Sequence, residues 1–509
     1  MKFTRRGFLK LAAGAAAGAV AMASARRLAA GEPAQGAPLA APAARPNIVF
    51  IFADDMGYGD PRCFNPDSKC PTPNIDRLAA GGMKFTDAHA PVGVCVPSRY
   101  GLITGRYPFR SDKYRLRDDD ATIATVVKSA GYRTVMVGKW HLGFRPQGPA
   151  GGVAAGAGNV GKSGPAEGQA LRGGPVDHGF DYYFGIPASL DIPPYYYIEN
   201  DRAVAPPTGH IDEHHSPGVR DIQGEFWRAG GIAPGFKHEE TLPTLARKAL
   251  DLLDEHHKSH AARPLMMYLA LPAPHTPWAP SPKYKGTSKC GDYGDYAAQV
   301  DGVVGDVLDK LDSLGMTDRT MVIFTSDNGP VWYPEDVARY GHRSVGPLRG
   351  MKADVWEGGN RMPFIARWPG HVQAGAASGE TICFTDMMAT FAELAGAKLG
   401  QAGEDSFSIV PILLGKKLDA PLHDATILQA ANGMFAIRRG KWKLILGTNS
   451  GGFSPKTKPG PDTPKGQLYD ISADPAEQKN LYNEKPRVVA ELTALLESLR
   501  KSPATAPRR

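Results

Sequence analysis

The sequence carries little net charge for its length, and this argues against a protein built to bind nucleic acid. Its 509 residues hold 59 Lys and Arg against 52 Asp and Glu, a formal charge of +7. Four of the basic residues and no acidic residue fall within residues 1–25, so the remainder carries only +3. A nucleic-acid-binding surface requires a much stronger basic excess. We therefore expect no nucleic-acid partner.

Long hydrophobic runs are also scarce. The most extended apolar stretch lies in residues 1–25 and consists of Ala and Gly rather than Leu, which makes a single membrane anchor the weaker interpretation. A basic start and the closing Ala23-Ser24-Ala25 are typical of a cleaved signal peptide. Residues 4–10, TRRGFLK, resemble a twin-arginine export signal.

Together these features predict a twin-arginine signal peptide over residues 1–25 that is removed after export. We expect the twin-arginine translocase as a partner, a periplasmic or secreted location, and no stable membrane span after cleavage. Residues 26–45 are rich in Pro and Ala, which predicts a linker ahead of the folded part.

Cysteine is rare, with only five residues in the chain: Cys63, Cys70, Cys95, Cys290 and Cys383. An oxidising compartment favours pairing, and five cysteines leave one over. Cys63 and Cys70 are close enough in sequence to bridge a loop.

From Pro46 onward, apolar runs of strand length alternate with helical patterns, which predicts an α/β fold with a parallel sheet. The expected strands are residues 47–53, 133–137, 265–271, 320–325 and 362–367, and the expected helices are 74–80, 121–130, 241–256 and 293–314. Continuous hydrophobicity indicates strands buried on both faces. Residues 146–175 are a low-complexity stretch, which predicts a flexible surface insert.

Beyond about residue 418 the pattern changes to short antiparallel strands, 436–439 and 442–446, and a last helix, 486–499. We therefore expect a large domain over residues 46–417 and a smaller α+β domain over residues 418–509. The segment with His210, Glu213, His214 and His215 lacks helical metal-ligand spacing and is predicted to be a solvated loop rather than a metal site.

Polar residues of types that can bind ligands or catalyse reactions follow four of the predicted strands. They lie at the edge where open parallel sheets bind ligands. Asp54, Asp55, Asp327 and Asn328 are all hard oxygen donors, which favours Ca²⁺ or Mg²⁺ over zinc. A second group offers positive charge and hydrogen-bond donors: Lys139, His141, His275 and Lys352. Together the two groups predict a pocket for a small, multiply oxygenated anion.

Cys95 stands just before Pro97, which is typical of the first turn of a helix. The N-terminus of a helix attracts anions, so we expect this position to lower the pKa of the Cys95 thiol. Three roles then remain open for Cys95: thiolate nucleophile, structural thiol, or a residue that is modified.

Several segments resemble the type I, formylglycine-dependent sulfatases, the family that includes arylsulfatases and N-acetylgalactosamine-6-sulfatases. Cys95-Val96-Pro97-Ser98-Arg99 with Thr104-Gly105-Arg106 resembles the signature C-x-P-S-R…T-G-R. Residues 131–141, GYRTVMVGKWH, resemble the second signature. Residues 46–60, 327–329, 347–370 and 468–481 are similar to further family segments. Val96 departs from the small residue of many relatives, but the modifying enzyme chiefly reads Cys, Pro and Arg.

The resemblance implies an alkaline-phosphatase-like fold, in which a large, mostly parallel mixed sheet flanked by helices is followed by a smaller domain with a short antiparallel sheet. It also implies that a formylglycine-generating enzyme converts Cys95 to 3-oxoalanine (Cα-formylglycine). The hydrated aldehyde then cleaves a sulfate ester, on a sulfated carbohydrate or an aryl group, through a covalent sulfoenzyme intermediate. The remaining four cysteines are most simply explained as two disulfides.

Residue roles follow from the same resemblance. One Ca²⁺ is expected on Asp54, Asp55, Asp327, Asn328 and the modified Cys95. Arg99 and His141 are expected to position the formylglycine hydrate. Lys139, His275 and Lys352 are expected to bind the sulfate, with His275 preferred over Lys352 as the acid for the leaving group.

Two other functions remain open on these residues. A formylglycine-dependent phosphonate or phosphate ester hydrolase could use the same nucleophile, because the fold alone does not fix the ester. An inactive, sulfated-glycan-binding relative is less consistent with the sequence, because all the expected polar residues are present.

Overall fold

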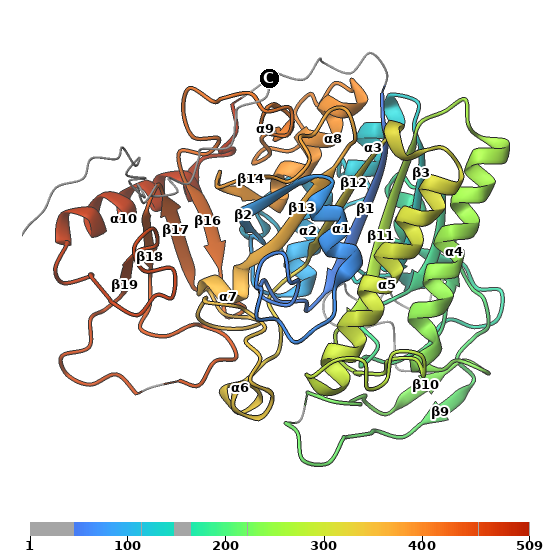
Figure 1. The fold of residues 1–509 in the computed structure, drawn as a ribbon, viewed down its shortest axis with the longest axis horizontal. Helices are drawn as coiled ribbons and strands as arrows, with labels where there is room; N and C mark the ends of the chain where they lie inside the picture. The colour runs from blue at the N-terminus through green and yellow to red at the C-terminus, as the bar shows by residue number, and fades with distance from the viewer. Residues whose placement is uncertain (1–44, 113, 147–163, 221, 457, 508–509) are drawn as a thin grey trace, which may run out of the picture. The chain divides into compact units, whose positions relative to one another are not determined.

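The computed structural model describes residues 45–112, 114–146, 164–220, 222–456 and 458–507 (Figure 1). These residues belong to one compact unit, Pro38–Arg509. The predicted signal peptide and all but the end of the predicted linker lie outside the described residues. No helix among the described residues is both long enough and apolar enough to cross a membrane.

A large mixed sheet organises the chain, with the order β14-β2-β13-β12-β1-β11-β3-β6-β7-β8 and with β15 paired to β2. Its strands are β1 (Asn47–Asp54), β2 (Met83–His89), β3 (Arg133–Lys139), β6 (Tyr182–Ile186), β7 (Ile198–Glu199), β8 (Arg202–Ala203), β11 (Leu265–Pro274), β12 (Thr320–Ser326), β13 (Arg361–Arg367), β14 (Ala376–Ser378) and β15 (Ile382–Cys383). The central strands β12, β1, β11, β3 and β6 are parallel, whereas β13 runs antiparallel to β12. The predicted mixed, mostly parallel sheet is confirmed.

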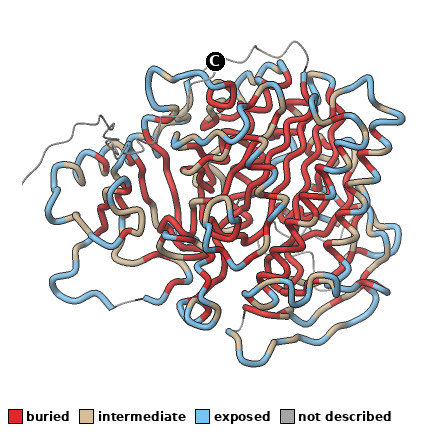
Figure 2. The backbone as a smooth tube through the Cα atoms, in the orientation of Figure 1, coloured by how far each residue is buried: buried red, intermediate tan, exposed pale blue. Residues whose placement is uncertain are grey.

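The position of strand β1 explains why residues 48–53 are all apolar. All eight residues are buried. Ile48, Phe50 and Phe52 enter one hydrophobic core, and Val49 and Ile51 enter the other. Because successive side chains of a strand point to opposite faces, a continuous apolar run is required wherever both faces are covered. Figure 2 shows the buried strands running through the interior.

Helices cover both faces of the sheet (Figure 1). The first core contains side chains of α2 (Cys95–Thr104), α3 (Ile123–Ser129), α8 (Met387–Ala395) and α9 (Val410–Leu413). The second contains side chains of α1 (Pro73–Ala80), α4 (His238–Ser259) and α5 (Gly291–Ser313). Two short helices, α6 (Pro334–Tyr340) and α7 (Glu357–Asn360), lie between β12 and β13. Each predicted helix is present, with ends shifted by three residues or fewer.

A separate antiparallel sheet is formed near the C-terminus, as predicted. It consists of β16 (Thr426–Gln429), β17 (Phe435–Arg439), β18 (Trp442–Ile445) and β19 (Gln467–Asp470), in that order. Helix α10 (Pro486–Lys501) packs its buried Leu492 and Leu496 into the same core as Ile427, Ile437 and Leu444.

Two small hairpins lie outside both sheets. Strand β4 (Arg145–Pro146) pairs with β5 (Leu171–Arg172), and β9 (Gly209–Ile211) pairs with β10 (Gly230–Ile232). Leu171 is 1% exposed. The described part of the predicted surface insert therefore contains a strand with a buried residue, whereas residues 147–163 of the insert lie outside the described residues.

The expectation of two disulfides is wrong. All five cysteines lie in the described part of the chain, and all are free. Cys63 faces α1, where its amide donates to Asp76, and Cys383 is buried in the C-terminal core. Only Cys70 and Cys290 are near each other, with 3.8 Å between their sulfur atoms, and they are not bonded. Tertiary structure, rather than closeness in sequence, decides which thiols meet.

We expect Gly138→Ala to destabilise the protein strongly. Gly138 has φ +115° and lies beside Ala270 of β11, and an added Cβ would lie 1.9 Å from the Ala270 carbonyl oxygen. Because that atom is backbone, the two strands would have to separate, at a cost of about 3 kcal/mol or more. Urea unfolding measures the loss.

Gly131→Ala is the matched control for this substitution. Gly131 also has positive φ, +86°, but an added Cβ would meet nothing within 4 Å. Backbone strain alone predicts a loss of about 1 kcal/mol there. Equal losses for the two variants would contradict the steric explanation.

Candidate active site

The predicted functional residues meet at one edge of the large sheet because four parallel strands end there. Asp54 ends β1, Lys139 ends β3, His275 follows β11, and Asp327 follows β12. The carboxyl ends of neighbouring parallel strands lie side by side, so residues far apart in sequence come into contact. Lys139 donates a hydrogen bond to Asp54, and the backbone N–H of Asp55 lies 3.2 Å from Asp327 Oδ1 and donates to it.

Asp54, Asp55, Asp327 and Asn328 form a buried cluster of oxygen-bearing side chains, none more than 2% exposed. Asn328 Nδ2 donates to Asp55 Oδ1 at 2.6 Å, which orients the amide. Asp54 Oδ1 and Asn328 Oδ1 have no hydrogen-bond partner among the described residues. Buried oxygens without a donor are costly, and an oxygen-only donor set is what Ca²⁺ and Mg²⁺ prefer. The cluster therefore fits a hard divalent cation.

The electrostatics of the cluster show how crowded its negative charges are. Burial raises the pKa of Asp54, but Lys139, His275 and Arg99 outweigh it, so the pKa lies well below its usual range. Burial and the charge of Asp54 raise the pKa of Asp327 to about 7. Without a cation, therefore, the ionised form of Asp54 is favoured and that of Asp327 is disfavoured.

Helix α2 begins at Cys95, as predicted, and carries the signature residues into the site. Arg99, one turn later, is 1% exposed, and its Nη2 donates to Asp327 Oδ2 at 2.8 Å. The predicted lowering of the Cys95 pKa is wrong: burial raises the pKa of this thiol, despite Lys139 and Lys352. Because the neutral thiol is favoured, the role of unmodified thiolate nucleophile loses its support.

His141 and Asp55 hold left-handed backbone conformations, with φ +60° and +64°. Such values are uncommon for residues other than glycine and concentrate at functional sites. Neither ring nitrogen of His141 has a hydrogen-bond partner among the described residues. Burial, Lys139 and Arg99 hold the pKa of His141 well below its usual range, so the neutral ring can both donate and accept.

Lys352 reaches the same edge from the loop before β13. Because β13 is antiparallel to β12, its beginning lies where the parallel strands end. Lys352 Nζ lies 2.6 Å from Asp55 Oδ1. Burial opposes the charged form, but Asp55 and other nearby acids outweigh it and raise the pKa of Lys352. Lys352 is thus a fixed positive charge.

His275 is the second histidine of the site. Its Nδ1 lies 2.6 Å from the carbonyl oxygen of Thr276 and donates to it. The other nitrogen, Nε2, lies 3.7 Å from Asp55 Oδ2. The ring is therefore held through one nitrogen, while the other faces the charged cluster.

A cavity of about 700 Å³ opens over these residues. Cys95, His141 and His275 line it together with Val94, Val96, Pro97, Pro108, Phe109, Ser111, Tyr114, Ser189, Asp191, Ile192 and Ala431. The volume is typical of a site for a small ligand. Sequence reasoning did not identify Ser189 and Asp191, because both lie in an irregular segment after β6 without a family motif.

Several other histidines and charged residues lie away from this site. His89 and His423 are hydrogen-bonded to Asp87 and Asp386, and His178 stacks on Trp140, so these three histidines have structural roles. Arg361 pairs with Glu357 and Asp87. The residues His210, Glu213, His214 and His215 are exposed or nearly so and belong to none of the potential metal-binding groups among the described residues.

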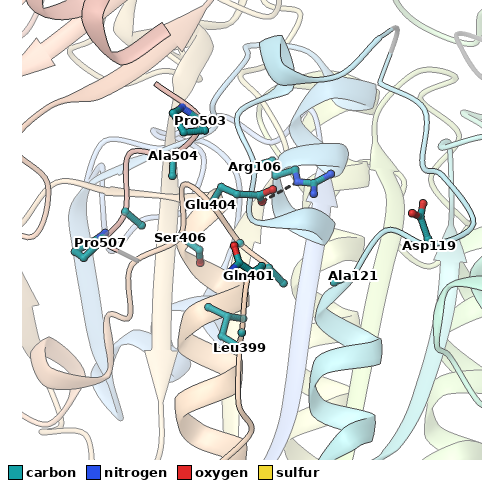
Figure 3. Close-up of a pocket in the computed structure, with 14 residues that line it drawn as sticks. Arg106, Asp119, Ala121, Leu399, Gln401, Glu404, Ser406, Pro503, Ala504 and Pro507 are labelled. Atoms are coloured by element: carbon teal, nitrogen blue, oxygen red, sulfur yellow. Dashed lines mark hydrogen bonds and ion pairs between the residues drawn. The ribbon is translucent and has the colours of Figure 1, made fainter. Parts of the chain in front are cut away.

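A second cavity, of about 390 Å³, lies between the segment that joins α2 to α3, the loop after α8 and the C-terminal segment (Figure 3). Figure 3 shows Arg106 directed at Glu404, with 2.7 Å between Arg106 Nε and Glu404 Oε2. Arg106 also pairs with Asp120. Since these charges satisfy one another, and none of the residues at the strand ends lines this cavity, we assign the chemistry to the 700 Å³ cavity.

Comparisons with known proteins agree with this geometry. Residues 46–397 match the family model described as Sulfatase, and residues 351–502 match the one described as N-sulphoglucosamine sulphohydrolase, C-terminal. An N-acetylgalactosamine-6-O-sulfatase from Bacteroides thetaiotaomicron is 34% identical over 90% of this chain and 93% of its own. Human arylsulfatase A is 33% identical over 89% of this chain and 87% of its own.

Solved structures show the same likeness. A sulfatase structure described in work on glycosaminoglycan metabolism by Bacteroides thetaiotaomicron superposes with a TM-score of 0.75 and is 32% identical, covering 90% of this chain and 100% of its own. A phosphonate monoester hydrolase from Agrobacterium radiobacter shares the fold at 18% identity, with a TM-score of 0.58, covering 90% of this chain and 95% of its own. This chain therefore belongs to the sulfatase family and is a sulfuric ester hydrolase.

Proposed function

We propose that this protein hydrolyses sulfate esters of glycans with a Cα-formylglycine at position 95 and one Ca²⁺ beside it. One observation carries the proposal: four oxygen-bearing side chains lie next to a buried cysteine and a set of positive hydrogen-bond donors, and two of their buried oxygens have no partner in the part of the chain that the structure describes. Asp54, Asp55, Asp327 and Asn328 would hold the ion, with the group at position 95 as a further ligand.

The Ca²⁺ ion and the formylglycine would have different tasks. When bound, Ca²⁺ supplies positive charge that orients the sulfate oxygens. The hydrated aldehyde at position 95 would supply one hydroxyl group as the nucleophile. Its second hydroxyl group would permit the release of sulfate, and an ester of serine or cysteine has no such second group.

The chain's own residues do the remaining work. Arg99, held by Asp327, and His141, with both ring nitrogens unpaired, position the group at residue 95. Lys139 and Lys352 are held by Asp54 and Asp55, and they neutralise the sulfate oxygens from two sides. Such preorganised donors need little rearrangement during the reaction.

We assign His275 as the acid that protonates the departing alcohol. Its Nδ1 proton is committed to the Thr276 carbonyl, so Nε2 is the nitrogen free to deliver a proton. An imidazole ring can release a proton and take one up again through the same nitrogen, as an acid that must be recharged in every cycle has to do. Lys352 is less suitable, because its acidic neighbours raise its pKa and make it retain its proton.

For the substrate we propose a sulfated carbohydrate, with 6-O-sulfated N-acetylgalactosamine as the first compound to test, because a relative aligned over most of the chain bears the name N-acetylgalactosamine-6-O-sulfatase. The direct test measures sulfate release from N-acetylgalactosamine 6-sulfate, chondroitin 6-sulfate and an aryl sulfate. Mass spectrometry of the peptide with residue 95 reports whether the thiol has become an aldehyde. An intact thiol in active protein would contradict the proposal.

We also propose that the formylglycine-generating enzyme acts in the cytoplasm before the twin-arginine translocase exports the folded chain. Residues 4–10 and Ala23-Ser24-Ala25 support this order. Fractionation of the native host tests it: the mature protein, starting after residue 25, should lie in the periplasm or the medium and already carry the aldehyde.

We expect removal of the metal to abolish activity and to lower the thermal stability. Three carboxylates converge in the cluster, and without a cation they repel one another. At a Ca²⁺ concentration 100 times its Kd, binding stabilises the folded state by about 2.7 kcal/mol. Calorimetry and sulfate release before and after chelation measure both effects, and added Ca²⁺ should restore them. Full activity after complete chelation would contradict the assignment.

A further inference from the structure

Two buried polar groups in the wall of the active-site cavity have no task in the reaction described above. Ser189 and Asp191 lie in the segment after β6 and are 3% and 6% exposed. Ser189 Oγ and Asp191 Oδ1 have no hydrogen-bond partner among the described residues. Both residues line the same cavity as Cys95 and His275.

The other carboxylate oxygen of Asp191 is fixed in place. Arg228 Nη1 donates to Asp191 Oδ2 and, at 3.1 Å, to the Asp191 carbonyl oxygen. The backbone N–H of Arg228 donates to the same carbonyl. With one oxygen held by a guanidinium, the carboxylate cannot turn to find a partner for Oδ1.

His275 does not satisfy the free oxygen either. Its Nδ1 lies 3.9 Å from Asp191 Oδ1, beyond hydrogen-bond distance, and that nitrogen already donates to the Thr276 carbonyl. An ionised carboxylate can only accept hydrogen bonds. A buried oxygen of this kind is costly unless a donor arrives from outside the chain. A ligand that fills this cavity can supply that donor as an O–H or N–H group.

The rest of the cavity wall indicates what carries that group. Val96, Pro97, Phe109, Tyr114 and Ile192 give it a largely apolar lining. A sugar ring offers both features that this wall requires: apolar C–H faces and hydroxyl donors on its rim. A bare aryl ring would meet the apolar residues but would leave Asp191 and Ser189 unpaired.

We propose that Asp191, assisted by Ser189, forms a subsite for the ring hydroxyl group that lies nearest to the sulfate ester of a sugar substrate, which is the 4-hydroxyl group in a 6-sulfated hexose. The subsite rests on the proposed sulfatase reaction and selects its substrate. Asp191 Oδ1 lies 3.9 Å from Nδ1 of His275, and Nε2 of the same ring is the nitrogen assigned to the departing oxygen, so a hydroxyl group bound by Asp191 would belong to the same sugar ring as the sulfate ester. A site that hydrogen-bonds a substrate hydroxyl rejects the analogue without it, because the buried acceptor is then left unpaired.

The test compares two substrates with two enzymes. The substrates are N-acetylgalactosamine 6-sulfate and its 4-deoxy analogue, and the enzymes are the wild type and Asp191→Ala, both as the mature, modified protein. For the wild type we expect kcat/KM to fall about 10- to 100-fold when the hydroxyl is removed. For Asp191→Ala we expect the two substrates to be hydrolysed with nearly equal kcat/KM. Additive effects of the two deletions would overturn the proposal.

An aryl sulfate separates this role from an indirect effect through His275. Asp191→Ala should change its hydrolysis less than about threefold, since there is no hydroxyl to lose. An equal fall on the aryl and sugar sulfates would show that Asp191 acts on the catalytic groups, and would overturn the subsite. Asp191→Asn keeps an oxygen acceptor without the charge and should recover part of the loss on the sugar substrate.

Asp212→Asn, an exposed carboxylate on a nearby loop, is the control variant and should leave the substrate preference unchanged. Thermal unfolding of each variant shows whether it is folded. The proposed function fails separately from the subsite, because it fails if the wild type releases no sulfate from any of these compounds. If the wild type is active and equally fast on the deoxy sugar, only the subsite is wrong.

Discussion

Replacing Cys95 by alanine is expected to reduce kcat for sulfate release by a factor on the order of 10⁴ to 10⁶, the range found when the nucleophile of a hydrolase is removed. The reason is that no other side chain in the cavity offers the chemistry. Arg99, Lys139 and Lys352 are held as cations by acids, and Ser189 Oγ has no base within hydrogen-bond distance among the described residues. Sulfate release and thermal unfolding measure activity and folding separately.

Two further variants make the Cys95 result specific. Cys95→Ser retains one hydroxyl but not the second, so it should release at most one equivalent of alcohol and then stop. Cys383→Ala removes another buried thiol, one that lies in the C-terminal core and does not line the active-site cavity, and should retain its activity. Sustained turnover by Cys95→Ser, or by Cys95→Ala, would show that residue 95 does not supply the nucleophile.

The positions of the site residues could be predicted from the sequence because each follows a continuous apolar run. Asp54, Lys139, His275 and Asp327 come at the ends of parallel strands, and such ends meet wherever the strands are neighbours. Lys352 is different, since it precedes an antiparallel strand. Its charge marked it as a candidate, but no strand end placed it in the site, because the direction of β13 is decided by packing that no local pattern encodes.

Local rules failed where tertiary burial opposed them. The helix N-terminus at Cys95 favours a thiolate, but burial raises the pKa of this thiol. Spacing suggested a Cys63–Cys70 bridge, but the fold brings Cys70 to Cys290 instead. The sequence did not identify Asp191 as a candidate for substrate binding. That role depends on a carboxylate oxygen in an irregular loop that has no partner among the described residues. Catalytic residues at strand ends can thus be predicted from the sequence, whereas the loop residues that select the substrate cannot.

Glu357→Gln is expected to destabilise the fold by about 3 to 5 kcal/mol at pH 7. Glu357, at the start of α7, is fully buried and accepts from Arg361 at 2.6 Å and from Lys443 at 2.9 Å. Burial raises its pKa, but Arg361, Lys443 and Arg438 outweigh it and hold the pKa well below its usual range. The neutral amide leaves buried cations uncompensated. Urea unfolding at pH 7 measures the loss.

Glu477→Gln is the matched variant, because Glu477 contacts the same Lys443 at 2.9 Å and is equally buried. Burial raises the pKa of Glu477 to about 7, despite Lys443. A carboxyl group with a raised pKa in the folded state loses stability as pH rises from its unfolded value, about 4.3, through 7. Glutamine mimics the protonated form, so Glu477→Gln should cost less than about 1 kcal/mol at pH 7 and should flatten that decline. Equal losses for the two variants would show that the buried charges act as one undivided network rather than through Glu357.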